Sequence, residues 1–422
     1  MRRPRPLIAL LLASAGLACA PRARADFYLK DGDRVVFYGD SITDQRLYTT
    51  FVETYALTRF PRRDVTFVHS GWGGDRVTGG GGGPIDRRLE RDVFAYKPTV
   101  LTIMLGMNDA SYRAFDDKIF QTYATGYEHI LEAVKARLPD VRITVIQPSP
   151  FDDVTQPPRF EGGYNAVLVR YGEYLKELAN RQHVDLADLN SPVVAALLKA
   201  KETDAALAQK IIPDRVHPGP GGHLLMAAAL LDAWDAPATV SAVTIDAGGE
   251  TPRATAAENA KVTDLAATAG RLSWTQEDAA LPMPIDRNDP VIALAVRSSD
   301  VMDQLNQQPL RVTNAKAAKY TLTIDGQEVG SFTREGLAEG INLAEHRTPM
   351  AQQAAEVHAL TLLHNNAHFV RWRQLQVPFQ DEERPQLKGA LAGLDNLERG
   401  LVAQQRAAAQ PRPHRFELIP QQ

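Results

Sequence analysis

A serine, an aspartate and a histidine in this chain have the types and spacing that nucleophilic catalysis needs. A serine hydroxyl attacks a carbonyl group only when a base removes its proton, and a third group must hold that base in one tautomer. Ser41 is the candidate nucleophile, His217 the base and Asp214 the orienting carboxylate. Because Asp214 and His217 are three residues apart, they fit on one turn, with the carboxylate at Nδ1 and Nε2 facing the serine. This set predicts acyl transfer through a covalent intermediate.

Each of these residues also has a purely structural interpretation. Ser41 follows Asp40 and stands where a serine caps the N-terminus of a helix, an interaction worth about 1 kcal/mol. His217 precedes Pro218 and also fits an exposed loop histidine. His223 has no acidic residue at the matching spacing, so we assign it a structural role. We expect Asp40 to fix the turn before Ser41 by accepting backbone hydrogen bonds.

The elements that must position these residues alternate between strand and helix patterns from residue 26 to residue 235. Five short apolar runs predict strands, and five stretches with apolar residues at helical spacing predict helices. Continuous apolar strands separated by helices indicate a parallel sheet covered on both faces, in which ligands gather at the carboxyl ends of the strands. The predicted strands are 34–38, 65–68, 100–105, 141–146 and 184–188, and the predicted helices are 47–60, 123–138, 164–181, 191–201 and 224–233.

Compact polar clusters follow the first three strands, and a fourth cluster precedes the last helix. They are Gly39-Asp40-Ser41-Ile42-Thr43, Gly71-Trp72-Gly73-Gly74-Asp75, Gly106-Met107-Asn108-Asp109 and Asp214-Arg215-Val216-His217. In order and residue type, these clusters resemble the four blocks of the GDSL/SGNH hydrolase family, over roughly residues 31–234. The resemblance implies a three-layer, flavodoxin-like α/β fold and a serine esterase.

The resemblance also implies which groups bind the tetrahedral oxyanion, and the loss of one such donor typically costs about 3–4 kcal/mol. Carried over to this sequence, the donors are the backbone N–H of Ser41, the backbone N–H of Gly74 and the side-chain amide of Asn108. The glycines of the second block also fit an ordinary turn. This block has His69-Ser70 where the family often has an asparagine, which leaves the geometry of the loop open.

Three further aspartates, Asp44, Asp75 and Asp109, are expected to line the site or to support its loops without transferring protons. The run Gly79–Gly83 lacks the Lys-Ser/Thr of a phosphate-binding loop and predicts a flexible loop at the edge of the site. The sequence contains neither G-x-S-x-G nor H-E-x-x-H, so it indicates neither an ordinary α/β-hydrolase nor a zinc protease. We expect no cofactor and no metal ion.

The first 25 residues have the layout of a secretory signal peptide. Met1–Arg5 is basic, Leu7–Ala20 is small and apolar but too short to span a bilayer comfortably, and Ala23-Arg24-Ala25 offers a cleavage site. We therefore expect export to the periplasm or the extracellular space. The single cysteine, Cys19, leaves open a lipoprotein anchor. Cleavage after the A-x-A motif leaves a chain without a thiol or a disulfide.

Composition and charge argue against several classes of protein. The chain has 422 residues, 44% hydrophobic and 23% charged, which argues against a disordered, collagen-like or multi-span membrane protein. Residues 1–25 hold five arginines and no acid, so the rest has 42 basic and 51 acidic residues, a net charge of −9 instead of −4. Such a protein has no general attraction for nucleic acid or anionic membranes. The expected partner is an ester substrate, either a small molecule or a polysaccharide.

The pattern changes after Trp234, and we divide the chain into four parts. They are the signal peptide (1–25), the catalytic domain (26–235), a small β-rich domain (236–342) and a helical region (343–422). The β-rich part contains short strand patterns and a hairpin that turns at Asp325-Gly326. The last part predicts two helices, over 343–374 and 382–409, which fit an antiparallel pair, and an edge strand over 416–419.

These observations predict an exported serine esterase that removes O-acyl groups, acetyl above all, from a carbohydrate through an acyl-enzyme on Ser41. Two alternatives stay open. One is a lipase or thioesterase of broad specificity. The other is a glycan-binding protein in which hydrolysis is secondary or lost, with Trp274, Tyr320 and Phe332 as the aromatic residues available to stack on sugars. An acyltransferase acting between sugars would use the same catalytic residues.

Overall fold

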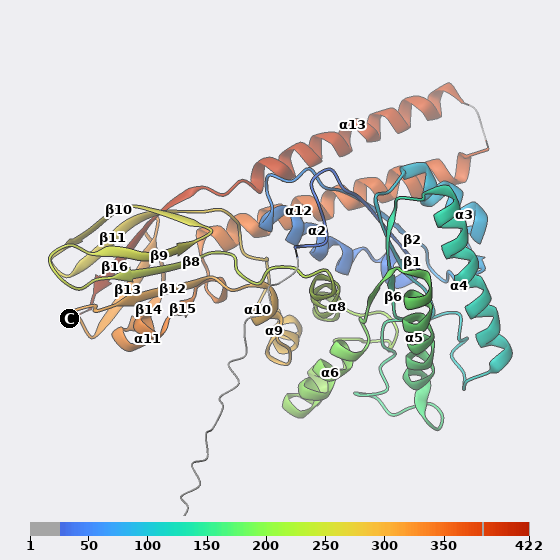
Figure 1. Cartoon of the computed structure of the whole chain (residues 1–422), viewed down its shortest axis with the longest axis horizontal. Helices are drawn as coiled ribbons and strands as arrows, with labels where there is room; N and C mark the ends of the chain where they lie inside the picture. The colour runs from blue at the N-terminus through green and yellow to red at the C-terminus, as the bar shows by residue number, and fades with distance from the viewer. Residues whose placement is uncertain (1–25, 382–383, 422) are drawn as a thin grey trace, which may run out of the picture.

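The computed structural model describes residues 26–381 and 384–421, and the predicted signal peptide with Cys19 lies outside them. The first part of the chain forms a parallel sheet in the order β2-β1-β5-β6-β7 (Figure 1). Its central strand β5 is buried along its whole length, as a continuous apolar run predicts. The strands are β1 (Arg34–Gly39), β2 (Thr66–Gly71), β5 (Val100–Met104), β6 (Arg142–Ile146) and β7 (Asp185–Ala187). The predicted fold class is confirmed.

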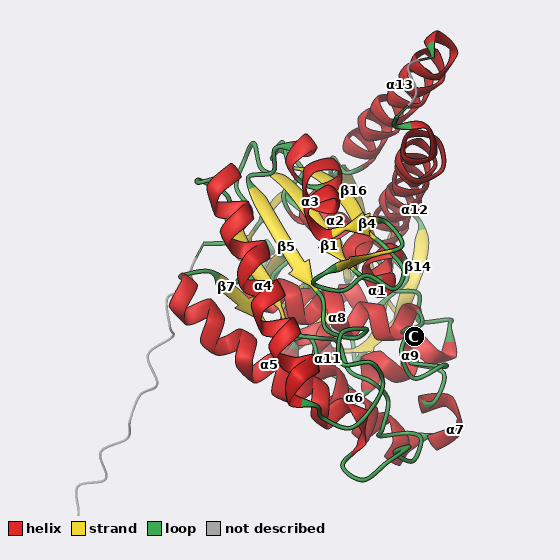
Figure 2. Cartoon of the chain, turned by 90° about the vertical axis from the view of Figure 1, so that its right-hand side faces the viewer, coloured by secondary structure: helices red, strands yellow, loops and turns green. Residues whose placement is uncertain are grey.

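Helices cover both faces of this sheet (Figure 2). The helices α2 and α8 pack together on one face, and α4 and α5 pack together on the other. The chain moves one way across the sheet from β1 to β2 and the other way from β2 to β7, so right-handed crossovers place the connecting helices on opposite faces. The helices are α1 (Ser41–Asp44), α2 (Leu47–Arg59), α3 (Ile85–Asp92), α4 (Asp117–Arg137), α5 (Gly163–Gln182), α6 (Ser191–Thr203), α7 (Ala205–Ala208) and α8 (Pro220–Ala233).

The glycine run is not the flexible loop that the sequence predicts. Its residues form an antiparallel two-stranded ribbon of β3 (Gly79–Gly80) and β4 (Gly83–Pro84). A Cβ on Gly82 would lie 2.5 Å from the Cδ of Arg88 and 2.8 Å from the Cδ2 of Trp72. Glycine is needed here because the ribbon lies directly against these two side chains.

Two further sheets share a second hydrophobic core (Figure 1). One is antiparallel, in the order β10-β11-β16-β13-β14, and the other has the order β15-β12-β8-β9. The predicted hairpin is confirmed, because β13 and β14 meet at Asp325 and Gly326, which both have the positive φ of a tight hairpin turn. The strands are β8 (Ala242–Asp246), β9 (Arg253–Glu258), β10 (Ala260–Thr268), β11 (Arg271–Asp278), β12 (Pro309–Thr313), β13 (Lys319–Ile324), β14 (Gln327–Thr333), β15 (Ile341–Asn342) and β16 (Pro413–Pro420).

The structure differs from the predicted division of the chain at two places. The helices α9 (Pro290–Arg297) and α10 (Val301–Leu305) lie inside the predicted β-rich stretch, yet their apolar side chains belong to the first core. Near the C-terminus, β16 pairs with both β11 and β13, so it is a central strand and not the predicted edge strand. Local patterns indicate the type of an element, but these partners are distant in sequence and leave no local signal.

The C-terminal region contains the two predicted helices, α12 (Pro349–Phe369) and α13 (Pro385–Ala408), which pack against each other. They run from the second core along the parallel-sheet domain (Figure 1). In this stretch α12 packs against α2 and β2. After α12 the chain continues as a π-helical segment, Val370–Gln376.

A buried carboxylate, Glu53 of α2, joins this helical pair to the sheet. Its Oε2 lies 3.0 Å from Nε2 of His69 and accepts from Asn365 Nδ2 at 3.1 Å, while Oε1 accepts from Gln405 Nε2 at 3.1 Å. Burial by itself raises the pKa of a carboxyl, but the hydrogen bond from His69 and the neighbouring histidines outweigh it, so the pKa of Glu53 lies below its usual value. Four elements thus meet at one ionised side chain.

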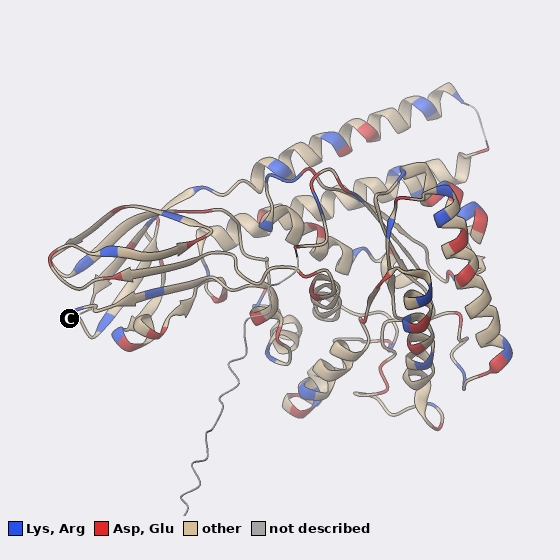
Figure 3. Ribbon diagram, in the orientation of Figure 1, with Lys and Arg blue, Asp and Glu red and all other residues tan. Residues whose placement is uncertain are grey.

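The charges of the outer helices are mixed in sign. Lys and Arg are interspersed with Asp and Glu along α4 and α5, so these helices present no basic stripe to a polyanion (Figure 3). Within residues 26–381 and 384–421, no helix combines the length and apolar character needed to cross a membrane.

We predict that Phe416→Ala lowers the free energy of unfolding by about 3–5 kcal/mol, because it opens a cavity beneath a central strand. Phe416 is fully buried in β16 and stacks on Trp274 with 5.2 Å between ring centroids. Urea unfolding followed by tryptophan fluorescence measures the loss. Phe332→Ala, on the edge strand β14 where the ring is half-buried, is the matched control and should cost less than half as much. Equal losses in the two variants would contradict the central position of β16.

Candidate active site

Ser41, His217 and Asp214 form a continuous chain of hydrogen bonds. The Nε2 of His217 lies 2.8 Å from the Oγ of Ser41, and its Nδ1 lies 2.7 Å from the Oδ2 of Asp214. Ser41 opens α1 directly after β1, whereas His217 stands just before α8, 176 residues later. Hydroxyl, imidazole and carboxylate follow one another in the order that removal of the serine proton requires. The structure therefore brings together the three side chains that the sequence singles out.

Asp214 holds the imidazole from a largely exposed position. Its Oδ1 accepts the backbone N–H groups of Val216, at 2.9 Å, and of His217, at 2.7 Å. Partial burial works to raise the pKa of Asp214, but the hydrogen bonds from His217 and Val216 outweigh it, so this pKa lies below its usual value. An ionised Asp214 favours the tautomer with hydrogen on Nδ1, which leaves Nε2 free to accept the Ser41 proton.

Asp40, and not Ser41, caps the short helix α1. The Oδ1 of Asp40 accepts the N–H of Ile42 at 3.0 Å, in line with the expected role of Asp40 in the turn. The first helical position then falls on Ser41, whose hydroxyl is directed to His217. The helix-cap interpretation of Ser41 is replaced by this arrangement, since the capping side chain is its neighbour.

A hydrogen bond from Asn108 to the neighbour of Gly74 joins the loops that follow β5 and β2. The Nδ2 of Asn108 donates to the carbonyl oxygen of Asp75 at 3.1 Å, and Asp75 directly follows Gly74. Gly74 has a φ of 76°, the left-handed region that favours glycine. Because β1 lies between β2 and β5 in the sheet, these two loops flank the turn that carries Ser41. The sheet order thus places the loops of both predicted oxyanion residues on the two sides of the turn that carries the candidate nucleophile, and their oxyanion role stays a prediction.

Tyr112 is a residue of this site that the sequence analysis missed. Its hydroxyl donates to the Oδ1 of Asn108 at 3.0 Å, which directs the amide nitrogen of Asn108 toward the Gly74 loop. Its ring is 40% exposed and stacks on Tyr164 with 5.0 Å between centroids. Ser111 and Tyr112 both have positive φ, 60° and 55°, a strained backbone for residues other than glycine. No glycine marks this turn in the sequence, so no local signal indicates it.

Two of the three further aspartates support the loop that carries Gly74. The Oδ2 of Asp44 accepts the N–H of Gly73 at 3.3 Å. Asp75 is buried and accepts from Nε of Arg88 at 2.7 Å. These contacts agree with the expectation that the two carboxylates hold the loop in place.

The third, Asp109, is buried close to Asp40 beneath the site. The Oδ1 of Asp109 accepts the N–H of Val77 at 2.9 Å, while its Oδ2 has no hydrogen-bond partner among the described residues. Burial is the main influence on both groups and raises the pKa of Asp40 and of Asp109 to about 7, with mutual repulsion adding to the shift of Asp40. Each carboxyl group is therefore easier to protonate than an exposed aspartate.

Two other histidines near the site have structural roles. The Nδ1 of His223 accepts the N–H of Tyr48 at 3.2 Å, its Nε2 faces Gln45, and burial lowers the pKa of His223 to about 3. This agrees with its predicted structural role. His69, where the sequence departs from the family pattern, is buried against Glu53 of α2. The departure thus affects the packing of β2 on α2.

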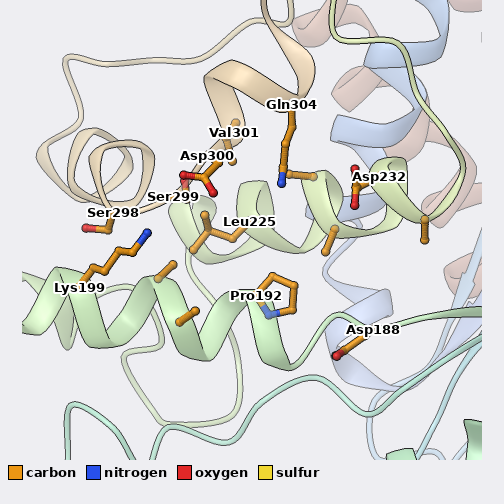
Figure 4. Close-up of a pocket in the computed structure, with 15 residues that line it drawn as sticks. Asp188, Pro192, Lys199, Leu225, Asp232, Ser298, Ser299, Asp300, Val301 and Gln304 are labelled. Atoms are coloured by element: carbon orange, nitrogen blue, oxygen red, sulfur yellow. The ribbon is translucent and has the colours of Figure 1, made fainter. Parts of the chain in front are cut away.

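A pocket of about 350 Å³ lies apart from these residues (Figure 4). Its lining comes mainly from α6, α8 and the turn between α9 and α10, and includes Lys199, Asp232 and Asp300. Ser41, Asp214 and His217 do not line this pocket. Across the described parts of the chain, no group of three or more His, Cys, Asp or Glu side chains is placed to hold a metal ion.

Comparisons with known proteins agree with this geometry. Residues 37–225 match the model of the GDSL-like lipase/acylhydrolase family. The acetylxylan esterase of Geobacillus stearothermophilus is 27% identical over 223 residues, which cover 47% of this chain and 93% of that protein. The structure is also similar to that of BT4096, a gut microbial diltiazem-metabolizing enzyme, with a TM-score of 0.81 and 26% identity over 93% of this chain and 98% of the other. The second similarity extends to the C-terminal region.

We predict that Asp109→Asn flattens the pH dependence of stability. A carboxyl whose pKa is 3.8 when unfolded and about 7 when folded favours folding most below about pH 4, and this contribution falls as the pH rises to about 7. Asparagine keeps the acceptor for the Val77 N–H and carries no charge. From pH 5 to pH 8, the unfolding free energy of the wild type should fall by at least about 1 kcal/mol more than that of the variant.

Urea unfolding at the two pH values measures this difference. Asp232→Asn, at an exposed position on α8, is the control and should behave as the wild type does. If Asp109→Asn kept the slope of the wild type, the raised pKa assigned to Asp109 would be wrong.

Proposed function

Because residues 37–225 belong to the GDSL-like lipase/acylhydrolase family, and the chain is thereby a serine ester hydrolase, we propose that it removes O-acyl groups, acetyl above all, from a carbohydrate. The observation that carries this proposal is the hydrogen-bonded chain from Ser41 through His217 to Asp214. The likeness to an acetylxylan esterase supports the choice of acetyl group and carbohydrate. The layout of residues 1–25 supports export as part of the same proposal.

In the first half of the proposed reaction, the Oγ of Ser41 attacks the carbonyl carbon of the ester while its proton passes to Nε2 of His217. The carbonyl oxygen becomes an oxyanion and accepts hydrogen bonds from the N–H groups of Ser41 and Gly74 and from the amide of Asn108. Asp214 remains ionised and stabilises the imidazolium ion. The tetrahedral intermediate then breaks its bond to the alcohol oxygen, which takes the proton from His217, and an acyl-enzyme remains.

In the second half, water attacks the acyl-enzyme and gives a proton to His217. The new tetrahedral intermediate uses the same oxyanion donors and releases the carboxylic acid, while His217 returns the proton to Ser41. In both halves of the reaction, the imidazole of His217 exchanges a proton with the alcohol or the water molecule on the side that faces Ser41. The exposed edge of His217, with 36% of its side chain accessible, admits an alcohol or a water molecule there.

An open apolar groove supports long-chain esters as a second candidate. The groove has a volume of about 690 Å³ and is lined by Val77, Pro84 and Ile85 and by one side of α4. Val77 is three residues beyond Gly74, so the groove adjoins the loop of the proposed oxyanion site. A long acyl chain extending along this loop from Ser41 would bury apolar surface in the groove, as a lipase or thioesterase substrate requires.

The three aromatic residues named for the glycan-binding alternative do not lie fully exposed at the surface. Trp274 and Tyr320 are buried in the second core, and Phe332 is half-buried. Stacking on a sugar ring requires an exposed aromatic face, so these three residues act in packing. In the proposed enzyme, the β-rich domain therefore belongs to the scaffold.

We predict that the mature protein hydrolyses p-nitrophenyl acetate faster than the butyrate or octanoate ester and releases acetate from acetylated xylan. Ser41→Ala should lower kcat by at least about 10⁴-fold, because it removes the nucleophile of the triad. Ser191→Ala, at an exposed serine that opens α6, should leave kcat unchanged.

Initial rates on the three esters, together with acetate released from the polymer, give the readout. A preference for octanoate would favour the long-chain alternative. Equal rates in Ser41→Ala and the wild type would contradict the mechanism itself.

We further predict that Tyr112→Phe lowers kcat about tenfold with little change in KM, because the amide of Asn108 loses the hydroxyl that orients it toward the oxyanion. Asn108→Ala removes the donor itself and should lower kcat by about 10²–10³-fold. Steady-state kinetics on p-nitrophenyl acetate measures both. Tyr174→Phe, whose hydroxyl bonds within the α4–α5 pair, is the control. A loss in Asn108→Ala no larger than that in the control would exclude the oxyanion role.

A further inference from the structure

Buried contacts join the C-terminal π-helical segment to the loop Gly71–Asp75, although about 300 residues separate them in sequence. The ring of Trp372 is buried and meets Trp72 edge-on with 5.8 Å between centroids and 82° between planes. The guanidinium of the next residue, Arg373, lies over the Trp72 ring. The segment thus contacts the loop through two consecutive side chains, one aromatic and one cationic.

Arg88 connects these contacts to both ends of the loop. It is fully buried, and its Nη2 donates to the carbonyl oxygen of Ser70 at 2.8 Å while its Nε donates to Asp75 at 2.7 Å. Its Nη1 pairs with Asp92, whose Oδ1 also accepts the indole N–H of Trp372 at 2.6 Å. Ser70 and Asp75 bracket the loop. A buried ionic network of this kind is rigid as long as every member keeps its partners.

The nucleophile turn is linked to the same C-terminal helix. Asp44, which accepts the N–H of Gly73, is the last residue of α1, the helix that Ser41 opens. Arg46 donates to the carbonyl oxygen of Asp44 at 2.6 Å, and its guanidinium lies 4.2 Å from the ring centroid of Phe369 at the end of α12. The turn that carries Ser41 and the loop Gly71–Asp75 are therefore both linked to the region that ends α12.

The winding of the chain changes in the segment that contacts Trp72. In an α-helix, consecutive side chains point about 100° apart around the axis. Over Val370–Gln376 the winding is π-helical, and both Trp372 and Arg373 lie against Trp72.

We propose that the segment Val370–Gln376 positions the loop Gly71–Asp75, so that the rate of acyl transfer depends on residues outside the family-matched part of the chain. The inference rests on the proposed function, because the loop matters through the oxyanion donor Gly74. Trp372 and Arg373 are positioning residues, since they act through Trp72, Arg88 and Asp92. The Gly74 N–H binds charge that develops only in the transition state, so displacement of the loop affects kcat more than KM.

The test compares Arg373→Gln with Arg371→Gln in the full-length mature protein. Arg371 belongs to the same segment, but its Nε pairs with Asp395 of α13 at 2.6 Å, away from the loop. In Arg373→Gln, kcat on p-nitrophenyl acetate should fall about tenfold with KM changed less than about twofold. Arg373→Lys should restore part of the rate, and Arg371→Gln should retain all of it.

Hydrogen exchange gives a second readout that needs no catalytic activity. Peptides that contain Gly71–Asp75 should exchange faster in Arg373→Gln than in the wild type or in Arg371→Gln. Trp372→Phe keeps a ring against Trp72 but loses the donor to Asp92, and it should change exchange in the same direction. Thermal unfolding of each variant checks that the helical pair still folds.

Each outcome has a definite meaning. Unchanged exchange of the loop in Arg373→Gln overturns the proposal, and so does faster exchange with an unchanged kcat. Equal effects in Arg371→Gln and Arg373→Gln would assign the change to general docking of the helices and also overturn it. If the wild type cleaves no ester while its Arg373→Gln variant shows faster loop exchange, the proposed function fails and the positioning of the loop stands.

Discussion

The hydrogen bond between Ser41 and His217 is the constraint on which the rest of the site depends. It joins the turn after the first strand to the turn before α8, and displacement by about 1 Å is enough to cost a large factor in rate. The fold meets this demand by fixing each turn separately. Asp40 caps α1, and the carbonyl oxygen of Arg215 accepts the N–H of Asp152, which ties the Asp214–His217 turn to the loop after β6. Behind them, α2 and α8 pack directly on each other.

The C-terminal half of the chain packs against the catalytic half and shares both hydrophobic cores with it. The first core includes side chains of α9 and α10, and the second core includes Leu57 of α2. Arg59 donates to the carbonyl oxygens of Pro237, Thr239 and Leu305, so these three hydrogen bonds of a buried charge form only when the parts are together. BT4096 shares this arrangement over 98% of its own length, so the extra parts accompany the sheet in at least one other solved protein.

What the sequence predicts well here is local. The strands, the main helices, the hairpin at Asp325 and the polar clusters with Ser41 and His217 all depend on patterns within a few residues, and they lie where expected. The role of Trp372 and the central position of β16 were not predictable, because each depends on partners far away in the chain. The strained turn at Ser111 and Tyr112 was missed because no glycine stands at its positions of positive φ, and the stacking of Tyr112 on Tyr164 depends on a residue far away in the chain.

The charges around the site explain why so many distant residues converge on it. Four carboxyl groups, those of Asp40, Asp44, Asp75 and Asp109, lie close to the loops that carry the predicted oxyanion residues, and at short range in a poorly solvated site like charges repel strongly. The chain reduces this repulsion in two ways. Burial raises the pKa of Asp40 and Asp109 to about 7, which favours their neutral forms. Arginines balance the others, Arg88 at Asp75 and Arg46 with Arg373 near Asp44. Because Arg373 comes from the C-terminal segment, that segment contributes to the electrostatics as well as to the geometry of the site.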